Sequence, residues 1–299
     1  GRGRRRPHIR HKEVYRLKKL VILGKGPAGI SAALYAVRGG ADVTVVGKSG
    51  GALEKAGLIQ NYYGFENGVD AKQLVAAGIK QAENLGAIVL DGEVSGIGFA
   101  ADGFEVKLTD GSVLPAGAVI IACGTSRNVP PIGNIRRFEG TGVSYCAVCD
   151  AFFFRGKKVA VIGSGAYAAG EYEELKNVVD DVTILTDGEE PQFSLPCDRR
   201  KIDRFEGGDF LEKVVFADGT SERFDGVFIA CGSAGAFELS KKLGLETADN
   251  KIVTDEKRAT NIPGVYAAGD CVAGLQQIAK AVCDGMIAGT EALRYLKSL

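Results

Sequence analysis

The feature that most constrains the fold is a strand–turn–helix pattern that occurs twice in the chain. In the first copy, an apolar run over residues 20–23 meets the turn Gly24-Lys25-Gly26-Pro27-Ala28-Gly29, which is followed by apolar residues at helical spacing. In the second copy, an apolar run over residues 158–162 meets the turn Gly163-Ser164-Gly165-Ala166-Tyr167-Ala168. Each copy continues into another short strand, which makes a βαβ unit of the nucleotide-binding type. The sequence therefore predicts an α/β protein with two doubly wound, three-layer Rossmann-like domains.

Both halves of the chain continue in a similar way after the βαβ unit. Each has a turn that joins short strands, and each then has an apolar closing strand that ends in glycine. The predicted closing strands are residues 118–124 and 226–232. Besides the helix that follows the first glycine turn, helices are predicted at residues 71–85, 169–178 and 276–297. The strand over residues 264–270 ends in Asp270, which is typical of a buried strand that meets a polar site.

The charge distribution separates a basic N-terminal stretch from an acidic remainder. The chain has 37 basic and 37 acidic side chains, yet nine of the basic residues and only Glu13 lie in positions 1–19. An acidic surface repels phosphate backbones, so nucleic acid is not an expected partner. No apolar run approaches the roughly 18 residues of a membrane span, so no membrane partner is expected and a cytoplasmic location is predicted. Residues 1–18 are expected to form a disordered tail, although such stretches also bind nucleic acid or address organelles.

The cysteines and histidines narrow the chemistry. Both histidines, His8 and His11, lie in the basic stretch, so the remainder has none for a metal site or a Ser-His-Asp triad, and no metal is expected. Cys146 and Cys149 are a closely spaced pair, and Asp150 beside them can supply a proton. The pair predicts redox chemistry, with half a zinc site or two buried structural cysteines as alternatives. Packed positions are expected for Cys123, Cys231, Cys271 and Cys283, with Cys197 in a polar loop.

The order of the motifs resembles one enzyme family. The motifs are GKGPAG, GGAL, NYYG, IIACG, CAVCDAFFFRGKKVAVIGSG, NIPGVYAAGD and QQIAKAVCDG. They are similar to the low-molecular-weight flavoprotein thioredoxin reductases over nearly all of residues 19–299, and a cysteine pair directly before the second glycine turn is specific to that group. The resemblance implies a homodimer that binds FAD. It also implies an FAD domain split in sequence, residues 19–126 and 239–299, around a shortened NAD(P)H-like domain, residues 127–238, which carries the cysteine pair.

The resemblance also implies a role for individual residues. The FAD pyrophosphate would be held by Gly24, Gly26 and Gly29. The flavin would be lined by Gly51, Leu53 and Asn61, the adenine by Val94, and the ribityl and isoalloxazine side by Asp270 and Gln277. The remaining members of the implied cofactor site are Pro27, Ala28, Ala52, Ala122, Gly124, Gly269 and Ile278. In the redox pair, Cys149 would face the flavin, Cys146 would attack the partner's disulfide, and Asp150 would be the acid.

Two positions depart from the usual nucleotide-binding patterns. The first βαβ strand is followed by Gly47-Lys48 where an acidic residue usually binds the ribose. NADPH-using family members follow the second strand with an arginine-rich segment for the 2′-phosphate, whereas this chain has Thr186-Asp187-Gly188-Glu189-Glu190. Acidic groups repel a phosphate, so NAD(P)H use is doubtful, although Asp187 can accept a 2′-hydroxyl of NADH. The pattern resembles the ferredoxin-dependent flavin thioredoxin reductases, which keep FAD and the cysteine pair.

The sequence therefore predicts an FAD-dependent disulfide reductase that passes electrons from flavin through Cys146 and Cys149 to thioredoxin or a thioredoxin-like protein. Its electron donor is predicted to be ferredoxin or another protein. An acidic ferredoxin needs a basic patch, and two clusters qualify, although both are expected to be ordinary solvated surface: Arg199, Arg200, Lys201 and Arg204, and Arg155, Lys157 and Lys158. The alternatives are an NADH- or NADPH-dependent thioredoxin reductase and a flavin-linked redox sensor. A ferredoxin–nicotinamide reductase would lack the cysteine pair.

Overall fold

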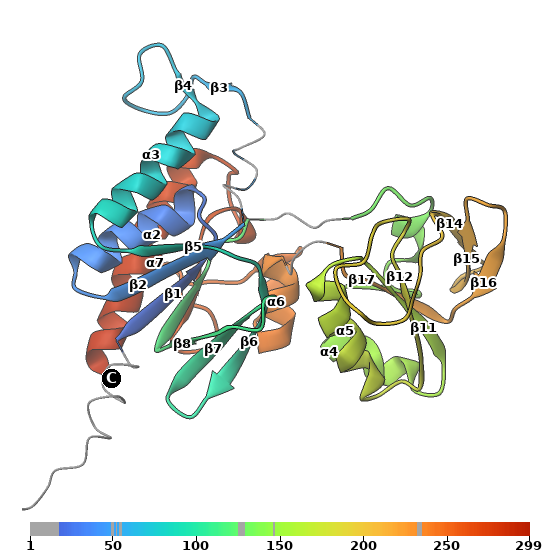
Figure 1. The fold of residues 1–299 in the computed structure, drawn as a ribbon. Helices are drawn as coiled ribbons and strands as arrows, with labels where there is room; N and C mark the ends of the chain where they lie inside the picture. Colours follow the sequence, from blue (N-terminus) through green and yellow to red (C-terminus); the bar gives the residue numbers. More distant parts are fainter. Residues whose placement is uncertain are drawn as a thin grey trace, which may run out of the picture. The chain divides into compact units, whose positions relative to one another are not determined.

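The computed structural model describes residues 18–48, 51, 53, 56–124, 129–145, 147–231 and 235–299, without the side chains of Val148 and Cys149. The chain forms two compact units (Figure 1). The first unit comprises residues 1–126 and 235–299, and the second comprises residues 127–234. The prediction of a basic tail over residues 1–18 falls almost entirely outside the described residues.

The first unit is built on a five-stranded parallel sheet with the strand order β20-β9-β1-β2-β5. Its strands are β1 (Lys19–Leu23), β2 (Asp42–Gly47), β5 (Ile88–Asp91), β9 (Ala118–Ile121) and β20 (Val265–Ala267). In the register, Leu20 lies between Val43 of β2 and Ala118 of β9. Because the strands are parallel, all their carboxyl ends lie along one edge of the sheet.

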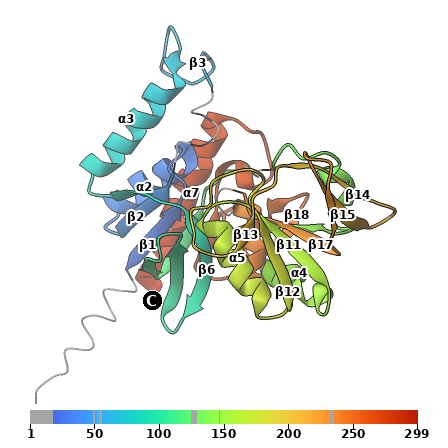
Figure 2. The same cartoon turned by 45° about the vertical axis from the view of Figure 1, so that its right-hand side comes forward.

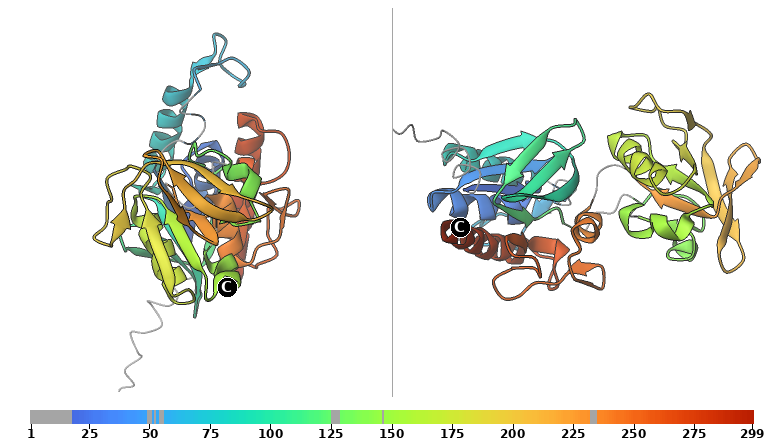
Figure 3. Two further views of the ribbon diagram at one scale, coloured as in Figure 1. Left: turned by 90° about the vertical axis from the view of Figure 1, so that its right-hand side faces the viewer. Right: turned by 90° about the horizontal axis from the view of Figure 1, so that it is seen from below.

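Helices and a second sheet complete the layers of the first unit. The helices are α2 (Pro27–Arg38), α3 (Ala71–Asn84), α6 (Ala236–Leu243) and α7 (Ile278–Ser298). The second sheet is the antiparallel β6-β7-β8, formed by Val94–Ala100, Gly103–Leu108 and Val113–Ala116. Seen from below, α2 and α7 lie on one side of the parallel sheet and the antiparallel strands on the other (Figure 3). Short strands complete the unit: β3 (Leu58–Ile59), β4 (Val69–Asp70), β18 (Thr247–Ala248) and β19 (Lys251–Ile252).

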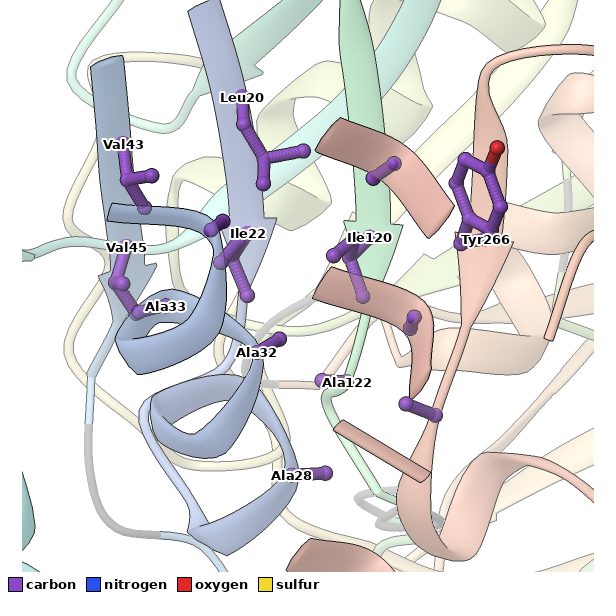
Figure 4. Packing of buried hydrophobic residues seen from close by; sticks show 14 of the residues in the cluster. Leu20, Ile22, Ala28, Ala32, Ala33, Val43, Val45, Ile120, Ala122 and Tyr266 are labelled. Carbon is purple, nitrogen blue, oxygen red and sulfur yellow. The ribbon is translucent and has the colours of Figure 1, made fainter. Parts of the chain in front are cut away.

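The core between α2 and the parallel sheet is aliphatic. Leu20, Ile22 and Val45 are buried on the sheet and face the small side chains of Ala32 and Ala33 on α2 (Figure 4). Small residues on the helix let its backbone approach the strands closely.

Helices α2 and α7 run side by side (Figure 2). The backbones of the two helices lie close together, because a Cβ at Gly285 of α7 would lie 2.1 Å from the carbonyl oxygen of Ala28 on α2. This packing fixes the beginning of α2 against the sheet edge.

The second unit repeats the parallel-sheet design with the strand order β10-β17-β11-β12-β13. Its strands are β10 (Val143–Ser144), β11 (Lys158–Ile162), β12 (Asp181–Leu185), β13 (Cys197–Asp198) and β17 (Gly226–Ile229), and its helices include α4 (Ala147–Asp150) and α5 (Ala166–Lys176). An antiparallel sheet of β14 (Ile202–Gly207), β15 (Leu211–Phe216) and β16 (Ser221–Arg223) is added to it. Short 3₁₀ turns are η2 (Ile135–Phe138), η3 (Ala151–Phe154) and, in the first unit, η4 (Gly269–Cys271).

The predicted fold class is confirmed, because each unit is a parallel sheet entered through a strand–glycine turn–helix connection. Helices α3 and α7 lie within two residues of their predicted bounds, whereas α5 begins three residues earlier than predicted, directly after Gly165. Within the described residues, none of the helices has the length and apolar character that a membrane span requires.

Candidate functional site

The first glycine turn joins β1 to α2 at the carboxyl edge of the parallel sheet. Gly24 has φ +111°, and a Cβ there would lie 2.3 Å from the carbonyl oxygen of Ala122. A Cβ on Gly29 would lie 1.8 Å from the carbonyl oxygen of Gly24. The α2 N-cap residue is Gly26, and no described side chain caps it. The first amide groups of α2 are therefore free to bind an anion such as a pyrophosphate.

The end of β2 is covered by a lysine instead of carrying an acidic residue. A Cβ on Gly47 would lie 2.8 Å from Cγ of Lys25, because the buried Lys25 side chain passes over it. The Lys25 ammonium group pairs with Asp91 at the end of β5. This position therefore offers no carboxylate to a ribose, which agrees with the departure seen at Gly47-Lys48 in the sequence.

Residues from distant parts of the chain meet at the same edge of the sheet. Gly269 follows β20, and a Cβ there would lie 2.8 Å from Cβ of Ala28 in the first turn of α2. The side-chain amide of Asn61 donates a hydrogen bond to Oε1 of Gln277, the residue before α7, at 3.0 Å. The fold thus brings together Asn61 and Gln277, and separately Gly269 and Ala28, at the position where a dinucleotide would lie.

The other predicted cofactor residues have the following positions. Pro27 is the first residue of α2, Ile278 is the first residue of α7, and Val94 is buried at the start of β6. Ala122 is buried just beyond β9, Gly124 is half-buried, and Asp270 is half-buried within η4. Gly51 is exposed and Leu53 half-buried, while Ala52 lies outside the described residues.

The cysteine pair belongs to the second unit, where β10 leads into α4. Cys146 and the side chain of Cys149 lie outside the described residues, so only the surroundings of the pair are described. Asp150 ends α4, and its Oδ2 accepts a hydrogen bond from the Ser144 hydroxyl at 2.6 Å. The backbone amide of Ala147 donates to Oε2 of the buried Glu171 on α5 at 2.9 Å. The helix that carries Cys149 is therefore held at its start and at its end.

Two exposed phenylalanines follow the helix that carries Cys149, α4, after one intervening residue. Phe152 is 67% and Phe153 is 70% exposed, which is unusual for large apolar side chains in a row. The guanidinium of Arg155 lies 5.0 Å from the centre of the Phe152 ring. This surface offers aromatic and cationic contacts immediately beside the cysteine pair.

The second glycine turn is built like the first, and a later segment of the same unit is hydrogen-bonded to it. A Cβ on Gly163 would lie 2.3 Å from the carbonyl oxygen of Ala230, and α5 starts after Gly165. Beyond β12, the chain returns so that the amide of Gln192 donates to the carbonyl oxygen of Ser164 at 2.8 Å. The nearest atom to a Cβ on Gly165 would be Oε1 of Gln192 at 3.9 Å. The segment around Gln192 therefore contacts the second glycine turn, while the N-cap residue of α5, Gly165, has no side-chain cap, as is also the case for Gly26 before α2.

Asp187, which the sequence offers as an acceptor for a ribose hydroxyl, has another use in the structure. Its Oδ1 accepts from the amide of Ile202 at 2.8 Å and its Oδ2 from the ammonium group of Lys201 at 3.0 Å. The Asp187 side chain is buried and joins the loop after β12 to β14. Both carboxylate oxygens thus already bind the unit's own chain, so a ribose hydroxyl of NADH would have to be bound alongside these two interactions.

The first basic cluster is neutralised by neighbouring carboxylates. Its ion pairs are Arg199 with Glu190, Arg200 with Asp198 and Glu222, Lys201 with Asp187, and Arg204 with Asp203 and Glu206. In the second cluster, Lys158 pairs with Glu222 at 2.9 Å. Arg155 and Lys157 contact the rings of Phe152 and Phe154, and no described carboxylate pairs with either. Of these two clusters, the second, which follows α4, thus has two cations that are not ion-paired with a described carboxylate.

The single cysteines are mostly inert. Burial raises the pKa of Cys123 to about 12, the pKa of Cys271 to about 12 and the pKa of Cys231 to about 11. These thiols stay protonated at neutral pH and are poor nucleophiles. The expected packing of Cys283 is wrong, because its place on α7 leaves it exposed, and Cys197 is half-buried in β13.

Comparisons with known proteins agree with these features. The model of the pyridine nucleotide-disulphide oxidoreductase family matches residues 18–200 and 198–285. A thioredoxin reductase of Listeria innocua serovar 6a is 33% identical, with 94% of each chain covered. Among solved structures, the atypical thioredoxin reductase TRi from Desulfovibrio vulgaris Hildenborough is 39% identical with a TM-score of 0.85, over 94% of this chain and 98% of that one. A ferredoxin-flavin thioredoxin reductase from Clostridium acetobutylicum is 29% identical with a TM-score of 0.67, over 94% and 98% of the two chains.

Proposed function

The chain belongs to the pyridine nucleotide-disulphide oxidoreductase family, and on this premise we propose that it is an FAD-dependent thioredoxin-disulfide reductase that receives its electrons from a protein and not from NADPH. The observation that carries the proposal is the loop after β12, which is bonded to its own unit. Asp187 accepts from Lys201 and from the amide of Ile202, and Gln192 donates to Ser164 in the second glycine turn. A 2′-phosphate of NADPH would have to compete with these bonds.

The first unit has the features that FAD requires. Its pyrophosphate fits the amide groups at the start of α2, which the small residues Gly24 and Gly29 leave accessible. Asn61, Asp270 and Gln277 supply polar groups at the same edge of the sheet. When bound, FAD supplies a two-electron carrier between the donor and the cysteine pair. We assign the first unit to the FAD domain and the second to the domain of the redox pair. The return to the FAD domain, expected at residue 239, is then at residue 235, so that α6 stays whole.

The residues of the second unit carry out thiol–disulfide exchange. The Cys146 thiolate attacks one sulfur of the thioredoxin disulfide, which forms a mixed disulfide and releases the other thioredoxin sulfur as a thiolate. We assign the proton transfer to a leaving thiolate to Asp150, whose carboxylate accepts a hydrogen bond from the Ser144 hydroxyl. Cys149 then attacks the sulfur of Cys146, which frees the reduced thioredoxin and closes the Cys146–Cys149 disulfide. Two electrons have then passed to thioredoxin, and the pair must be reduced again.

The choice of donor is also supported by the charged groups near the end of β12. Asp187 is ion-paired with Lys201 and Glu190 with Arg199, so the basic side chains of this loop are already engaged by carboxylates. The similar structure from Clostridium acetobutylicum is named for ferredoxin as well as for flavin. We therefore propose ferredoxin or another protein as donor, a cytoplasmic location and a homodimer.

An anaerobic titration tests the donor. The purified yellow protein is mixed in turn with NADPH, NADH and reduced ferredoxin, and flavin absorbance is followed. We expect reduced ferredoxin to bleach the flavin and the nicotinamides to leave it unchanged at concentrations up to about a millimolar, above usual cofactor affinities. Rapid bleaching by micromolar NADPH or NADH would overturn the donor assignment. A protein that lacks bound flavin and does not take it up would overturn the proposal as a whole.

Removal of one exposed ring tests the thioredoxin docking surface. We expect Phe152→Ala to raise the KM for thioredoxin about tenfold, because an exposed aromatic side chain beside the cysteine pair supplies apolar contact area to the partner. The rate with a small disulfide such as 5,5′-dithiobis(2-nitrobenzoate) should stay unchanged. The matched control is Phe210→Ala, which removes a ring that is 68% exposed on the same unit but follows β14. Equal KM values for both variants would exclude this surface.

A further inference from the structure

A cluster of buried charge on α7 has no counterpart in the sequence-based prediction. Asp284 lies in the second turn of α7 and is 1% exposed. Its Oδ2 accepts from the ammonium group of Lys280 at 2.8 Å and from the backbone amide of Gly269 at 3.1 Å. Its Oδ1 lies 2.9 Å from the guanidinium of Arg258. One carboxylate thus connects a helix, the turn after β20 and the segment that precedes β20.

The cluster holds both backbone polar groups of Gly269. The amide of Gly269 donates to Asp284, and the carbonyl oxygen of Gly269 accepts from Lys280 at 2.8 Å. The carbonyl oxygen of the next residue, Asp270, accepts from Lys251. The Gly269–Asp270 turn is therefore fixed from α7 on one side and from β19 on the other.

The arrangement is costly, which argues against a role in packing alone. Burial of charged groups carries a desolvation penalty that apolar side chains of similar size avoid. On the same helix, Ala281 and Ala288 fill core positions without any charge. Arg258 also adopts a left-handed backbone conformation with φ +61°, which is unfavourable for a residue other than glycine. The desolvation penalty and the strained backbone of Arg258 are best explained if the cluster serves to fix the geometry of the Gly269–Asp270 turn.

The geometry matters because of where the turn lies. Gly269 has φ +83°, and a Cβ there would lie 2.8 Å from Cβ of Ala28, in the first turn of α2. A shift of this turn would move Asp270 relative to the amide groups that are free to bind an anion. The turn thus lines the proposed cofactor site, and the Asp284 cluster holds it in place.

We propose that Asp284 is a positioning residue for the dinucleotide, and that with Lys280 and Arg258 it holds the Gly269–Asp270 turn in the conformation that receives the cofactor. The proposal rests on the proposed binding of FAD by the first unit. Asp284 itself acts through the backbone of Gly269, without contact to the ligand. Loss of its carboxylate should therefore weaken FAD binding more than it weakens the fold.

The test compares FAD affinity with the melting temperature of the apoprotein. FAD is removed, each variant is titrated with FAD, and flavin fluorescence quenching gives the dissociation constant. We expect Asp284→Asn to raise this constant at least tenfold and to blur the vibronic shoulder of the bound flavin spectrum. The control Glu291→Gln removes another carboxylate from α7, one that pairs with Arg294 and does not contact the turn. It should leave both properties unchanged.

A second variant separates positioning from stability. Asp284→Asn alone leaves Lys280 and Arg258 without their counter-charge and can destabilise the fold. The double variant Asp284→Asn with Lys280→Met removes one of the two cations, so its melting temperature should recover toward that of the wild type while FAD affinity stays low. Recovery of both properties, or wild-type affinity in both variants, would overturn the positioning role. Failure of the wild-type apoprotein to bind FAD would instead overturn the proposed function.

Discussion

Replacement of Cys149 by serine is expected to lower thioredoxin turnover by at least about 1,000-fold and to trap a covalent complex with thioredoxin. Cys146 can still attack the thioredoxin disulfide in this variant, but a serine hydroxyl cannot displace the thiolate from the mixed disulfide at neutral pH. The variant should therefore accumulate a one-to-one adduct, visible as a new band on a non-reducing gel and lost on addition of dithiothreitol. Turnover is measured with insulin as the final disulfide substrate.

The controls for this variant come from the same chain. Cys146→Ser should also be inactive but should form no adduct, because it lacks the attacking thiol. Cys283→Ser removes an exposed thiol on α7 and should leave turnover unchanged. Normal turnover in Cys149→Ser would exclude the proposed exchange, and an adduct formed by Cys146→Ser in place of Cys149→Ser would reverse the two roles.

The elements of the fold that could be predicted are those encoded by short-range patterns. The turn at Gly24 and the helix after it follow from a contiguous glycine motif, and α3 follows from apolar residues at helical spacing. The strands that carry the parallel sheets are apolar runs, which local sequence alone identifies. The fold class could therefore be predicted well, because each βαβ unit is local in sequence.

The features that could not be predicted depend on contacts between distant residues. Asn61 and Gln277 are 216 positions apart, so the family resemblance assigns both to the flavin site but does not predict their hydrogen bond. Likewise, Ser31 on α2 bonds to the carbonyl oxygen of Val282 on α7 across 251 positions. In the sequence, Asp284 cannot be distinguished from other acidic residues on helices, because its hydrogen bond with the amide of Gly269 forms only in the folded chain. Its only local signal was Lys280 one turn earlier, which is an ordinary surface pair in most helices.

Asp187 shows how a local reading of an acidic residue fails. Its position after a βαβ strand is where a ribose-binding carboxylate usually lies, and the sequence contains nothing that contradicts this role. The competing partners, Lys201 and the amide of Ile202, lie 14 and 15 positions further on, and the loop between them determines which interaction forms. The prediction that the acidic segment is unsuited to a phosphate thus cannot rest on a free negative charge at Asp187, because this carboxylate is bound by Lys201 and Ile202.

Replacement of Gly29 by alanine is expected to abolish FAD binding, with a dissociation constant raised by more than about 100-fold. The new Cβ would lie 1.8 Å from the carbonyl oxygen of Gly24. This oxygen is a backbone atom and the position of a Cβ is fixed by its own backbone, so no side-chain rotation relieves the clash. Overpacking of this kind costs about 1–3 kcal/mol or more, and the turn and α2 must separate to accommodate it. That separation displaces the amide groups that would bind the pyrophosphate. The measurement is the flavin content of the purified protein and FAD titration of its apoprotein.

The matched control is Gly98→Ala on β6, where an added Cβ meets no atom within 4 Å and the backbone has no left-handed conformation. This variant should purify with the same flavin content as the wild type, because it changes a glycine of the same unit without any clash. The contrast matters because glycine loss by itself alters the unfolded chain in both variants. If Gly29→Ala retained flavin while Gly98→Ala lost it, the cofactor would lie against the antiparallel sheet, and the glycine turn would be an ordinary connection between β1 and α2.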